Sequence, residues 1–117
     1  MAKIMLVDDE PMIRYLCKFI LNQMKIEVIE ANSGYDALDK IKQDGLPDAI
    51  YIDYRMPDMD GIQTISEIKK LYPEAKLVLL SAATEVMDEA TKAGATGFLS
   101  KPVIKANLIE LTNKILG

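Results

Sequence analysis

The sequence predicts an α/β protein in which a parallel β-sheet is covered by helices on both faces. Short apolar segments alternate with amphipathic segments of helical period along the whole chain. Several of the apolar segments carry no polar residue on either face, which is typical of strands in a buried parallel sheet. At 117 residues, half of them apolar and 6% aromatic, the chain suits one domain, residues 1–117, with an aliphatic core.

The first strand is expected at residues 4–7 and is followed by Asp8, Asp9 and Glu10. Pro11 then suits the first position of a helix, because its fixed φ and missing N–H are tolerated there. The residues with a 3.6-residue spacing on the expected core face are Ile13, Leu16, Cys17, Ile20, Leu21 and Met24.

A second apolar stripe on this helix consists of Met12, Tyr15 and Phe19. One interpretation is a docking surface for a partner protein, and the other is packing against the last helix. We favour packing for Phe19 and leave Met12 open.

The next two units repeat the pattern. Val28 and Ile29 lie in the second strand, and Ser33 is expected to cap a helix. The third strand, about residues 48–53, ends at Asp53, and the Met-Pro that follows delays the next helix to about Gly61. The expected inward residues of these two helices are Ala37, Leu38 and Ile41, then Ile62, Ile65, Ile68 and Leu71.

The last two units are expected to have strands at 77–80 and 98–100, which lead to Ser81 and Lys101. The helix between them, 84–93, is rich in alanine and only weakly amphipathic, so we expect it to be the least firmly packed. The final helix places apolar residues on one stripe at Ile104, Leu108, Leu111 and Ile115.

Composition excludes several classes of function. A net charge of −4 gives no electrostatic reason for contact with nucleic acid or an anionic membrane. The single cysteine, Cys17, cannot form an internal disulfide, and neither a signal peptide nor a membrane span is present, so we expect a reducing, cytoplasmic location. There is no histidine, which excludes any mechanism that needs an imidazole of this chain.

Residues that could carry chemistry lie just past the strands. In parallel α/β sheets ligands bind at the carboxyl ends of the strands, where Asp8, Asp9, Asp53, Ser81 and Lys101 are expected. If the first and third strands are neighbours, at about 4.8 Å, their carboxylates come within range of one ligand. Three acids would then face one ammonium, and a divalent cation would relieve the repulsion.

Oxygen ligands from separate loops favour Mg²⁺, with Mn²⁺ as the alternative, because Mg²⁺ keeps several waters and shares phosphate oxygens. Asp53 is then the nucleophile that accepts a phosphoryl group as an acyl phosphate, with Lys101 and Ser81 near the phosphoryl oxygens. A plainer explanation of Asp8, Asp9 and Glu10 is that they favour a helix N-terminus. That explanation does not account for the acid that ends the central strand.

Taken together, four motifs resemble those of the response-regulator receiver domains of two-component systems, of the single-domain chemotaxis-regulator kind. The resemblance covers the whole chain, and the four motifs in this order and spacing are highly specific. The motifs are Asp8-Asp9, Ile52-Asp53 with Met56-Pro57-Asp58-Met59-Asp60-Gly61, Leu80-Ser81-Ala82, and Ala93-Gly94-Ala95-Thr96-Gly97-Phe98 ending in Lys101-Pro102. It implies a flavodoxin-like, doubly wound five-stranded sheet of order 2-1-3-4-5 with five helices.

The resemblance implies a role for each site residue. Asp53 corresponds to the phosphoacceptor, Asp9 to the direct metal ligand and Asp8 to its partner, which acts partly through water. The backbone carbonyl of Arg55 would complete the protein ligands of the metal. Lys101 would contact the phosphoryl group.

The resemblance also implies a switch. Ser81 corresponds to the switch hydroxyl and Phe98 to the switch aromatic, although Phe98 has no hydroxyl, and plain packing in the core is an equal alternative for it. The Lys101–Pro102 bond is expected to be cis, which only an X–Pro bond adopts at low cost.

The function implied is a phosphorylation-operated switch that takes a phosphoryl group from a histidine kinase or phosphotransfer protein. Such a protein catalyses only its own phosphorylation and dephosphorylation. Its output would be a rearrangement of the fourth helix, fifth strand and fifth helix. No effector domain follows the fifth helix, so we expect either action on a protein target by contact or a fragment of a longer regulator.

Three other functions fit the sequence less well. A phosphohydrolase of the haloacid-dehalogenase type usually has a second acid two residues after its nucleophile, where this chain has Arg55. A flavodoxin-like redox role does not suit the acidic loop after the first strand. A receiver-like scaffold without phosphorylation would not need the full acid set. Within the receiver interpretation, Arg55 is expected to hinder water from reaching the phosphoryl group and Ala83 to leave it access.

Overall fold

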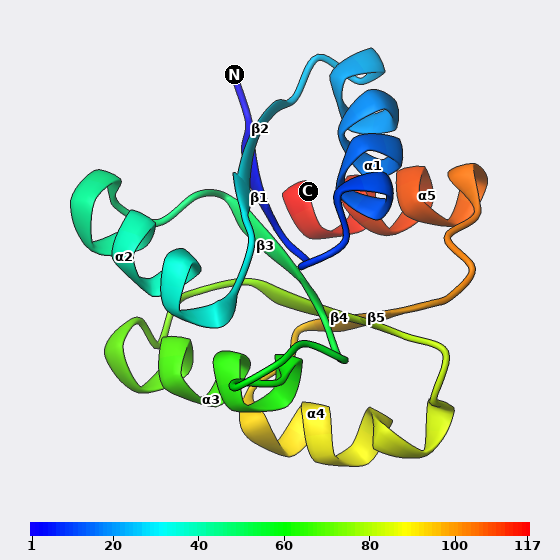
Figure 1. Ribbon diagram of the computed structural model, residues 1–117. Helices are drawn as coiled ribbons and strands as arrows, with labels where there is room; N and C mark the ends of the chain where they lie inside the picture. Colours follow the sequence, from blue (N-terminus) through cyan, green and yellow to red (C-terminus); the bar gives the residue numbers. More distant parts are fainter.

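The computed structural model describes residues 1–117 as one parallel sheet of five strands, in the order β2-β1-β3-β4-β5 (Figure 1). The strands are β1 Lys3–Val7, β2 Glu27–Ala31, β3 Ala49–Asp53, β4 Leu77–Ser81 and β5 Gly97–Ser100. The helices are α1 Pro11–Gln23, α2 Gly34–Asp44, α3 Gly61–Leu71, α4 Met87–Ala93 and α5 Lys105–Leu116. The predicted flavodoxin-like fold and strand order are confirmed. None of the helices is long and apolar enough to span a membrane.

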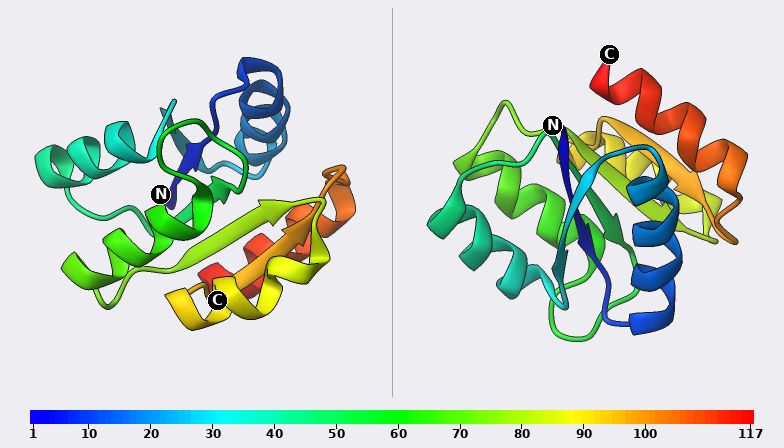
Figure 2. Two further views of the ribbon diagram at one scale, coloured as in Figure 1. Left: turned by 60° about the horizontal axis from the view of Figure 1, so that its bottom comes forward. Right: turned by 90° about the horizontal axis from the view of Figure 1, so that it is seen from above.

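The sheet separates two hydrophobic cores. In β3, Ile50 and Ile52 point into the core under α2, α3 and α4, whereas Ala49 and Tyr51 point into the core under α1 and α5. Figure 2 shows these two helical layers on opposite sides of the sheet. Successive strand residues alternate between faces, so both cores together explain the continuous apolar runs within β1, β3 and β4. The edge strand β2 departs from this pattern and is only partly buried.

The strand register brings the carboxyl ends of the strands to one edge. Val7 of β1 lies opposite both Ala31 of β2 and Ile52 of β3. One step further, Asp53 lies opposite Leu80 of β4. The loops that follow β1, β3 and β4 therefore emerge beside one another, as the sequence predicted.

The loop between β3 and α3 is fixed at both of its ends. The Gly61 amide donates to the Tyr54 carbonyl at 2.8 Å, and a Cβ on Gly61 would lie 2.4 Å from the Asp53 carbonyl oxygen. Only glycine permits this approach. At the start of α3, Asp60 accepts from the Gln63 amide at 2.8 Å and the Gln63 side chain accepts from the Asp60 amide at 3.0 Å. This capping box sets where the helix begins.

Other predicted helix starts are also confirmed. Pro11 is the first residue of α1, and the Ser33 hydroxyl accepts a hydrogen bond from the Asp36 amide at 3.0 Å. The segment predicted as one short helix at 84–93 is a 3₁₀ turn, Thr84–Val86, followed by α4. Within α4 only Ala90 is buried.

Several apolar residues predicted to face the core are exposed. The prediction was wrong for Leu16, Leu71 and Ile104, which expose 44%, 65% and 54% of their surface. Leu71 ends α3 and Ile104 precedes α5, so neither is held against the sheet by a continuing helix. Leu16 lies at the border of the buried face of α1.

The second stripe of α1 is also solvent-exposed. Phe19 is 53% exposed, so its predicted packing against α5 was wrong, and Met12 and Tyr15 are more exposed still. All three lie on the side of the helix opposite Cys17, the residue buried toward the sheet and α5. An exposed apolar face therefore runs along α1.

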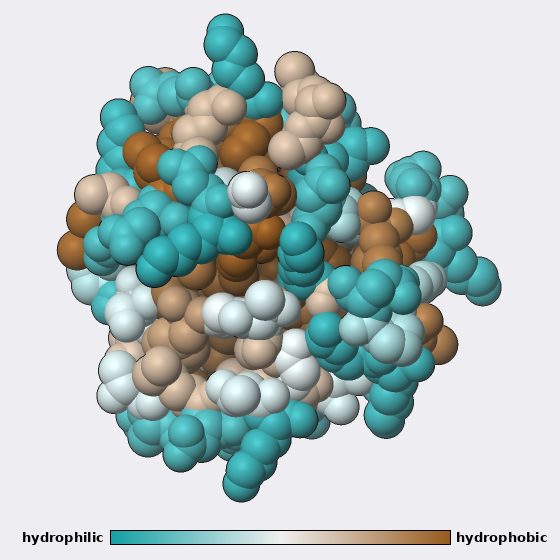
Figure 3. All heavy atoms as spheres, turned by 180° about the vertical axis from the view of Figure 1, so that it is seen from behind, coloured by the Kyte–Doolittle hydropathy of each residue, from teal (hydrophilic) through white to brown (hydrophobic).

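A second surface is formed by α5, the edge strand β5 and α4. It faces the reader in Figure 3, which shows the molecule from the side opposite to Figure 1. Strongly hydrophobic side chains gather in the upper part of this view among hydrophilic ones. A hollow of about 270 Å³ lies between β5 and α5. Its lining residues are Phe98, Leu99, Ser100, Asn107, Glu110, Leu111 and Lys114.

The buried Tyr51 hydroxyl and the Thr112 hydroxyl lie 2.6 Å apart and link β3 to α5. Replacement of Tyr51 by Phe leaves the Thr112 hydroxyl buried without a partner, so the free energy of unfolding should fall by about 1–3 kcal/mol. The double variant Tyr51→Phe/Thr112→Val should lose less than the sum of the two single variants. Urea denaturation measures all three.

Tyr35→Phe is the matched control, because Tyr35 is 59% exposed. We expect it to change stability by less than about 0.5 kcal/mol. Fully additive losses in the Tyr51/Thr112 pair would contradict a coupling between β3 and α5 through this bond.

Candidate functional site

Asp53 is the last residue of the central strand and is buried, with 3% of its surface exposed. Its carboxylate Oδ1 forms an ion pair with the Lys101 ammonium, which comes from the loop after β5. The Lys101 amide in turn donates to the Ser81 carbonyl at 3.0 Å, which ties that loop to the end of β4. The Lys101–Pro102 bond is cis, as expected.

Asp8 and Asp9, from the loop after β1, bring two more carboxylates to Asp53. One oxygen from each of the three residues lies within 4.8 Å of the other two. Asp8 is buried like Asp53, whereas Asp9 is exposed. The predicted convergence of acids from separate loops is therefore present, and one Mg²⁺-sized ion could be reached from all three.

The Asp8 carboxylate has an incomplete set of hydrogen bonds. Oδ1 accepts from the Glu10 amide at 2.9 Å, but Oδ2 is buried and has no hydrogen-bond partner. Burial raises the pKa of Asp8 to about 6, aided by the charges of Asp53 and Asp9 and opposed by the Glu10 amide and Lys101. An unpartnered buried carboxylate oxygen is costly, and a hard cation would satisfy it, so these residues fit a divalent metal.

The Asp53–Lys101 pair does not neutralise the site. Burial raises the pKa of Asp53 above its ordinary value even though the bond to Lys101 lowers it. Burial lowers the pKa of the Lys101 ammonium, but the hydrogen bond and charge of Asp53 outweigh this and the net pKa is raised. Lys101 thus stays protonated at neutral pH, and one cation faces several acids.

A small hollow of about 110 Å³ opens beside Asp53. It is lined by Glu10, Asp53, Tyr54, Arg55, Ser81, Ala82 and Lys101. The Ser81 side chain is nearly inaccessible, and its hydroxyl oxygen accepts from the Ala83 amide at 2.9 Å. Ala83 itself is not among the lining residues. Lys101 and Ser81 line the same hollow, so both could contact a small group placed beside the Asp53 carboxylate.

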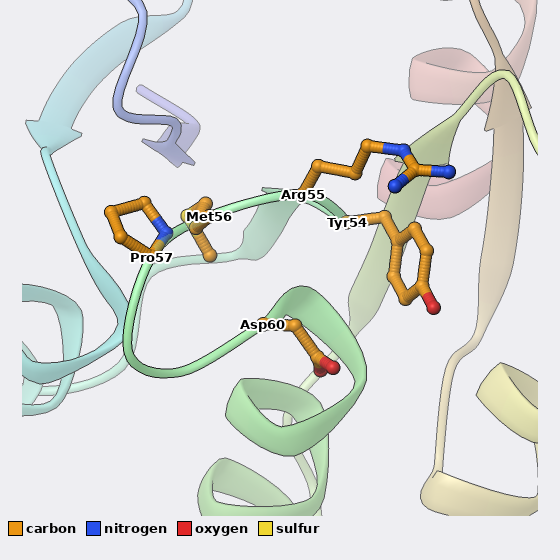
Figure 4. Close-up of a pocket in the computed structure, with 5 residues that line it drawn as sticks. All are labelled: Tyr54, Arg55, Met56, Pro57 and Asp60. Carbon is orange, nitrogen blue, oxygen red and sulfur yellow. The ribbon is translucent and has the colours of Figure 1, made fainter.

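The loop after β3 borders a second, wider hollow of about 430 Å³ (Figure 4). Arg55 extends from this loop toward Tyr54 rather than toward Asp60. The centre of its guanidinium lies 5.7 Å from the centroid of the Tyr54 ring, within the range of a cation–π contact. Arg55 thus lines both this hollow and the smaller one beside Asp53.

Phe98 is partly buried and packs against the core under α2, α3 and α4. It also lines the hollow between β5 and α5. Its ring therefore occupies an intermediate position, in contact with both the core and the surface.

A family model described as the response regulator receiver domain matches residues 4–113. The chain belongs to this family. The chemotaxis protein CheY of Thermotoga maritima is 37% identical over 97% of this chain and 96% of its own length. The chemotaxis protein CheY of Bacillus subtilis is 36% identical, with 97% of each chain covered.

Solved structures agree with this assignment. The chemotaxis protein CheY4 of Vibrio cholerae superposes with a TM-score of 0.92 at 30% identity and covers 99% of both chains. The response regulator TrrA of Thermotoga maritima, solved in complex with Mg²⁺-BeF, has a TM-score of 0.91 at 33% identity and covers 99% of this chain and all of its own. The protein is therefore a CheY-like receiver domain of two-component signalling.

Two residues of this receiver domain's site were not predicted from the sequence. Glu10 was interpreted only as a charge at a helix N-terminus, yet it lines the hollow beside Asp53 and its amide binds Asp8. Arg14 donates to the backbone carbonyl of Asp8. The position of Arg14, one turn into α1 on the side of the β1 loop, was the signal available in the sequence.

The raised pKa of Asp8 predicts how the stability of the metal-free receiver domain varies with pH. The folded state holds the Asp8 proton more tightly than the unfolded chain, so stability is lost as pH rises from about 4 to about 6. A pKa raised from 3.8 to about 6 for Asp8 corresponds to about 3 kcal/mol. Asp8→Asn should therefore raise the free energy of unfolding by about 1–3 kcal/mol at pH 7 in EDTA, and by little at pH 4.

Urea denaturation at the two pH values measures this difference, with the exposed Asp39→Asn as the matched control. Added Mg²⁺ should stabilise the unmodified protein and should stabilise Asp8→Asn much less. An Asp8→Asn variant that is no more stable at pH 7 than at pH 4, relative to the unmodified protein, would contradict the buried-charge explanation.

Proposed function

We propose that this receiver domain, residues 1–117, accepts a phosphoryl group on Asp53 in a Mg²⁺-dependent reaction and so acts as a signalling switch. The observation that carries the proposal is the cluster of three carboxylates within 4.8 Å at the carboxyl edge of the sheet. The unpartnered Oδ2 of Asp8 supports the same conclusion.

Asp9, Asp8 and Asp53, with the backbone carbonyl of Arg55, would hold the metal, which is Mg²⁺ or Mn²⁺. Bound there, the ion would reduce the repulsion among the acids and the incoming phosphoryl oxygens. The complex of the similar regulator TrrA with Mg²⁺-BeF supports this choice of ion.

The Asp53 carboxylate then attacks phosphorus. A bond forms between its oxygen and phosphorus. The bond from phosphorus to the imidazole nitrogen of a histidine on the donor protein breaks, and that nitrogen keeps the electron pair. Lys101 exchanges part of its contact with Asp53 for a phosphoryl oxygen. The Ser81 hydroxyl, beside the hollow, donates to another.

The switch would work through Ser81 and Phe98. If the Ser81 hydroxyl turns to the phosphoryl group, its bond from the Ala83 amide is lost and the turn before α4 is released. The half-buried Phe98 ring can then pack more deeply and alter the surface of α4, β5 and α5.

We propose a sensor histidine kinase or a phosphotransfer protein as the phosphoryl donor, in the cytoplasm. The exposed apolar face of α1, with Met12, Tyr15 and Phe19, supports docking of such a partner. The output would be a downstream protein or a C-terminal effector domain. Similar proteins include both short and long chains. This chain covers 96% of the Thermotoga maritima CheY but only 26% of the Escherichia coli regulator GlrR.

Incubation with Mg²⁺ and a small acyl phosphate donor tests the proposal. We expect one phosphoryl group per chain, detected by intact-protein mass spectrometry, and its complete loss in EDTA or in Asp53→Asn. Asp58→Asn is the matched control, because Asp58 is an exposed acid of the same loop. Rapid turnover of unrelated phosphate esters would instead indicate a phosphohydrolase, and the absence of any labelling would overturn the proposal.

Arg55→Ala is expected to shorten the lifetime of phosphorylated Asp53, because Arg55 lines the hollow beside it. A gain on the order of threefold in the rate of phosphate loss corresponds to less than about 1 kcal/mol in barrier. Arg55→Lys keeps a long side chain and should retain the slower rate. An unchanged rate in Arg55→Ala would remove Arg55 from the control of water access.

A further inference from the structure

Asp8 is held in place by three hydrogen bonds in addition to its peptide neighbours. Its amide donates to the Ala31 carbonyl at the end of β2, at 3.1 Å. Its Oδ1 accepts from the Glu10 amide at 2.9 Å, and its carbonyl accepts from the Arg14 guanidinium. These bonds fix both the backbone and the side chain of Asp8, so that the unpartnered Oδ2 keeps one direction.

The Arg14 side chain connects Asp8 to the edge strand β2. Its Nε donates to the Glu30 carboxylate at 3.2 Å while another nitrogen donates to the Asp8 carbonyl. Arg14 exposes 17% of its side chain. Only a guanidinium presents several donors in one rigid plane, so it can bind both acceptors at once.

Glu30 is well suited to hold this guanidinium. Besides Arg14 it pairs with Lys18, at 3.3 Å, one helical turn further along α1. Burial raises the pKa of Glu30, but its hydrogen bonds to Lys18 and Arg14 and their charges outweigh this and lower it. Glu30 therefore remains an anion at neutral pH, and its strand is paired with β1 through Leu6.

We propose that Arg14, held by Glu30, is a positioning residue that orients Asp8 for the divalent metal. The inference rests on the metal site proposed above. Mg²⁺ requires near-ideal octahedral geometry with bonds of about 2.0–2.1 Å, so a small rotation of the Asp8 backbone would weaken binding. Groups that orient metal ligands from outside commonly contribute about 10- to 100-fold in affinity.

The sign of the effect separates positioning from simple electrostatics. Arg14 is a cation near a cation site, so loss of its charge alone would strengthen metal binding. Loss of its bond to the Asp8 carbonyl would weaken metal binding. Weaker binding in a variant that removes the charge therefore requires the positioning role.

The experiment measures the Kd of Mn²⁺ by electron paramagnetic resonance, with competition by Mg²⁺, on the full chain without a phosphoryl donor. Arg14→Gln should raise the Kd about tenfold. Arg14→Lys, which keeps the charge but not the planar fork, should raise it by a similar factor. Lys18→Ala is the matched control, since it removes an ion pair with Glu30 from the same helix without touching Asp8, and should change the Kd less than twofold.

Thermal denaturation shows whether each variant is folded. If Arg14→Gln does not fold, Arg14→Lys decides by the same criterion. A Kd that is unchanged or lower in the folded Arg14 variants, while Asp8→Asn still weakens binding, would overturn the role of Arg14 and leave the metal site intact. No saturable Mn²⁺ binding by the unmodified protein would instead overturn the metal site itself.

Discussion

The constraint on which this structure depends is the repulsion among carboxylates brought together at the end of a parallel sheet. The strands deliver Asp8 and Asp53 to the same edge, both nearly inaccessible to water, and Asp9 lies beside them. Lys101 is the one side-chain cation paired with the cluster. Burial without full compensation raises the pKa of both buried acids. The receiver domain thus holds a site that is unfavourable when empty and favours the binding of a cation.

Backbone contacts around the site hold the acidic residues and Lys101 in place despite this repulsion. They leave carboxylate oxygens free to bind a metal. Gly61 lets the start of α3 approach the Asp53 backbone, and the Ser81 carbonyl holds the loop that carries Lys101. Asp8 is held through its backbone and one carboxylate oxygen, so its other oxygen remains available. The burial of these carboxylates destabilises the fold. The two aliphatic cores offset this cost, because a fully buried Leu or Ile contributes about 1.5–3 kcal/mol.

The fold and most of the site could be predicted from the sequence, because the apolar strands are continuous in sequence and the site residues directly follow them. Continuous apolar segments identified β1, β3 and β4, and the residues that follow them are those of the site. Contacts between elements were less accessible to this reasoning. Phe19 was assigned to packing against α5 because periodicity gives a stripe but not its neighbour. Arg14 was missed because its bonds to the Asp8 carbonyl and to Glu30 depend on how α1 lies beside β1 and β2, which periodicity does not give.

The two cores have a further consequence for how the chain tolerates change. Tyr51 and Ile52 are adjacent in sequence, yet they belong to separate interiors divided by the sheet. Substitutions on opposite sides share few atomic neighbours, so their energetic effects should combine independently. One interior could then diverge among homologues, along with the helices that cover it, while the other stays unaltered. The helical surface over one core can thereby vary without disturbing the carboxyl edge of the sheet, which carries the site.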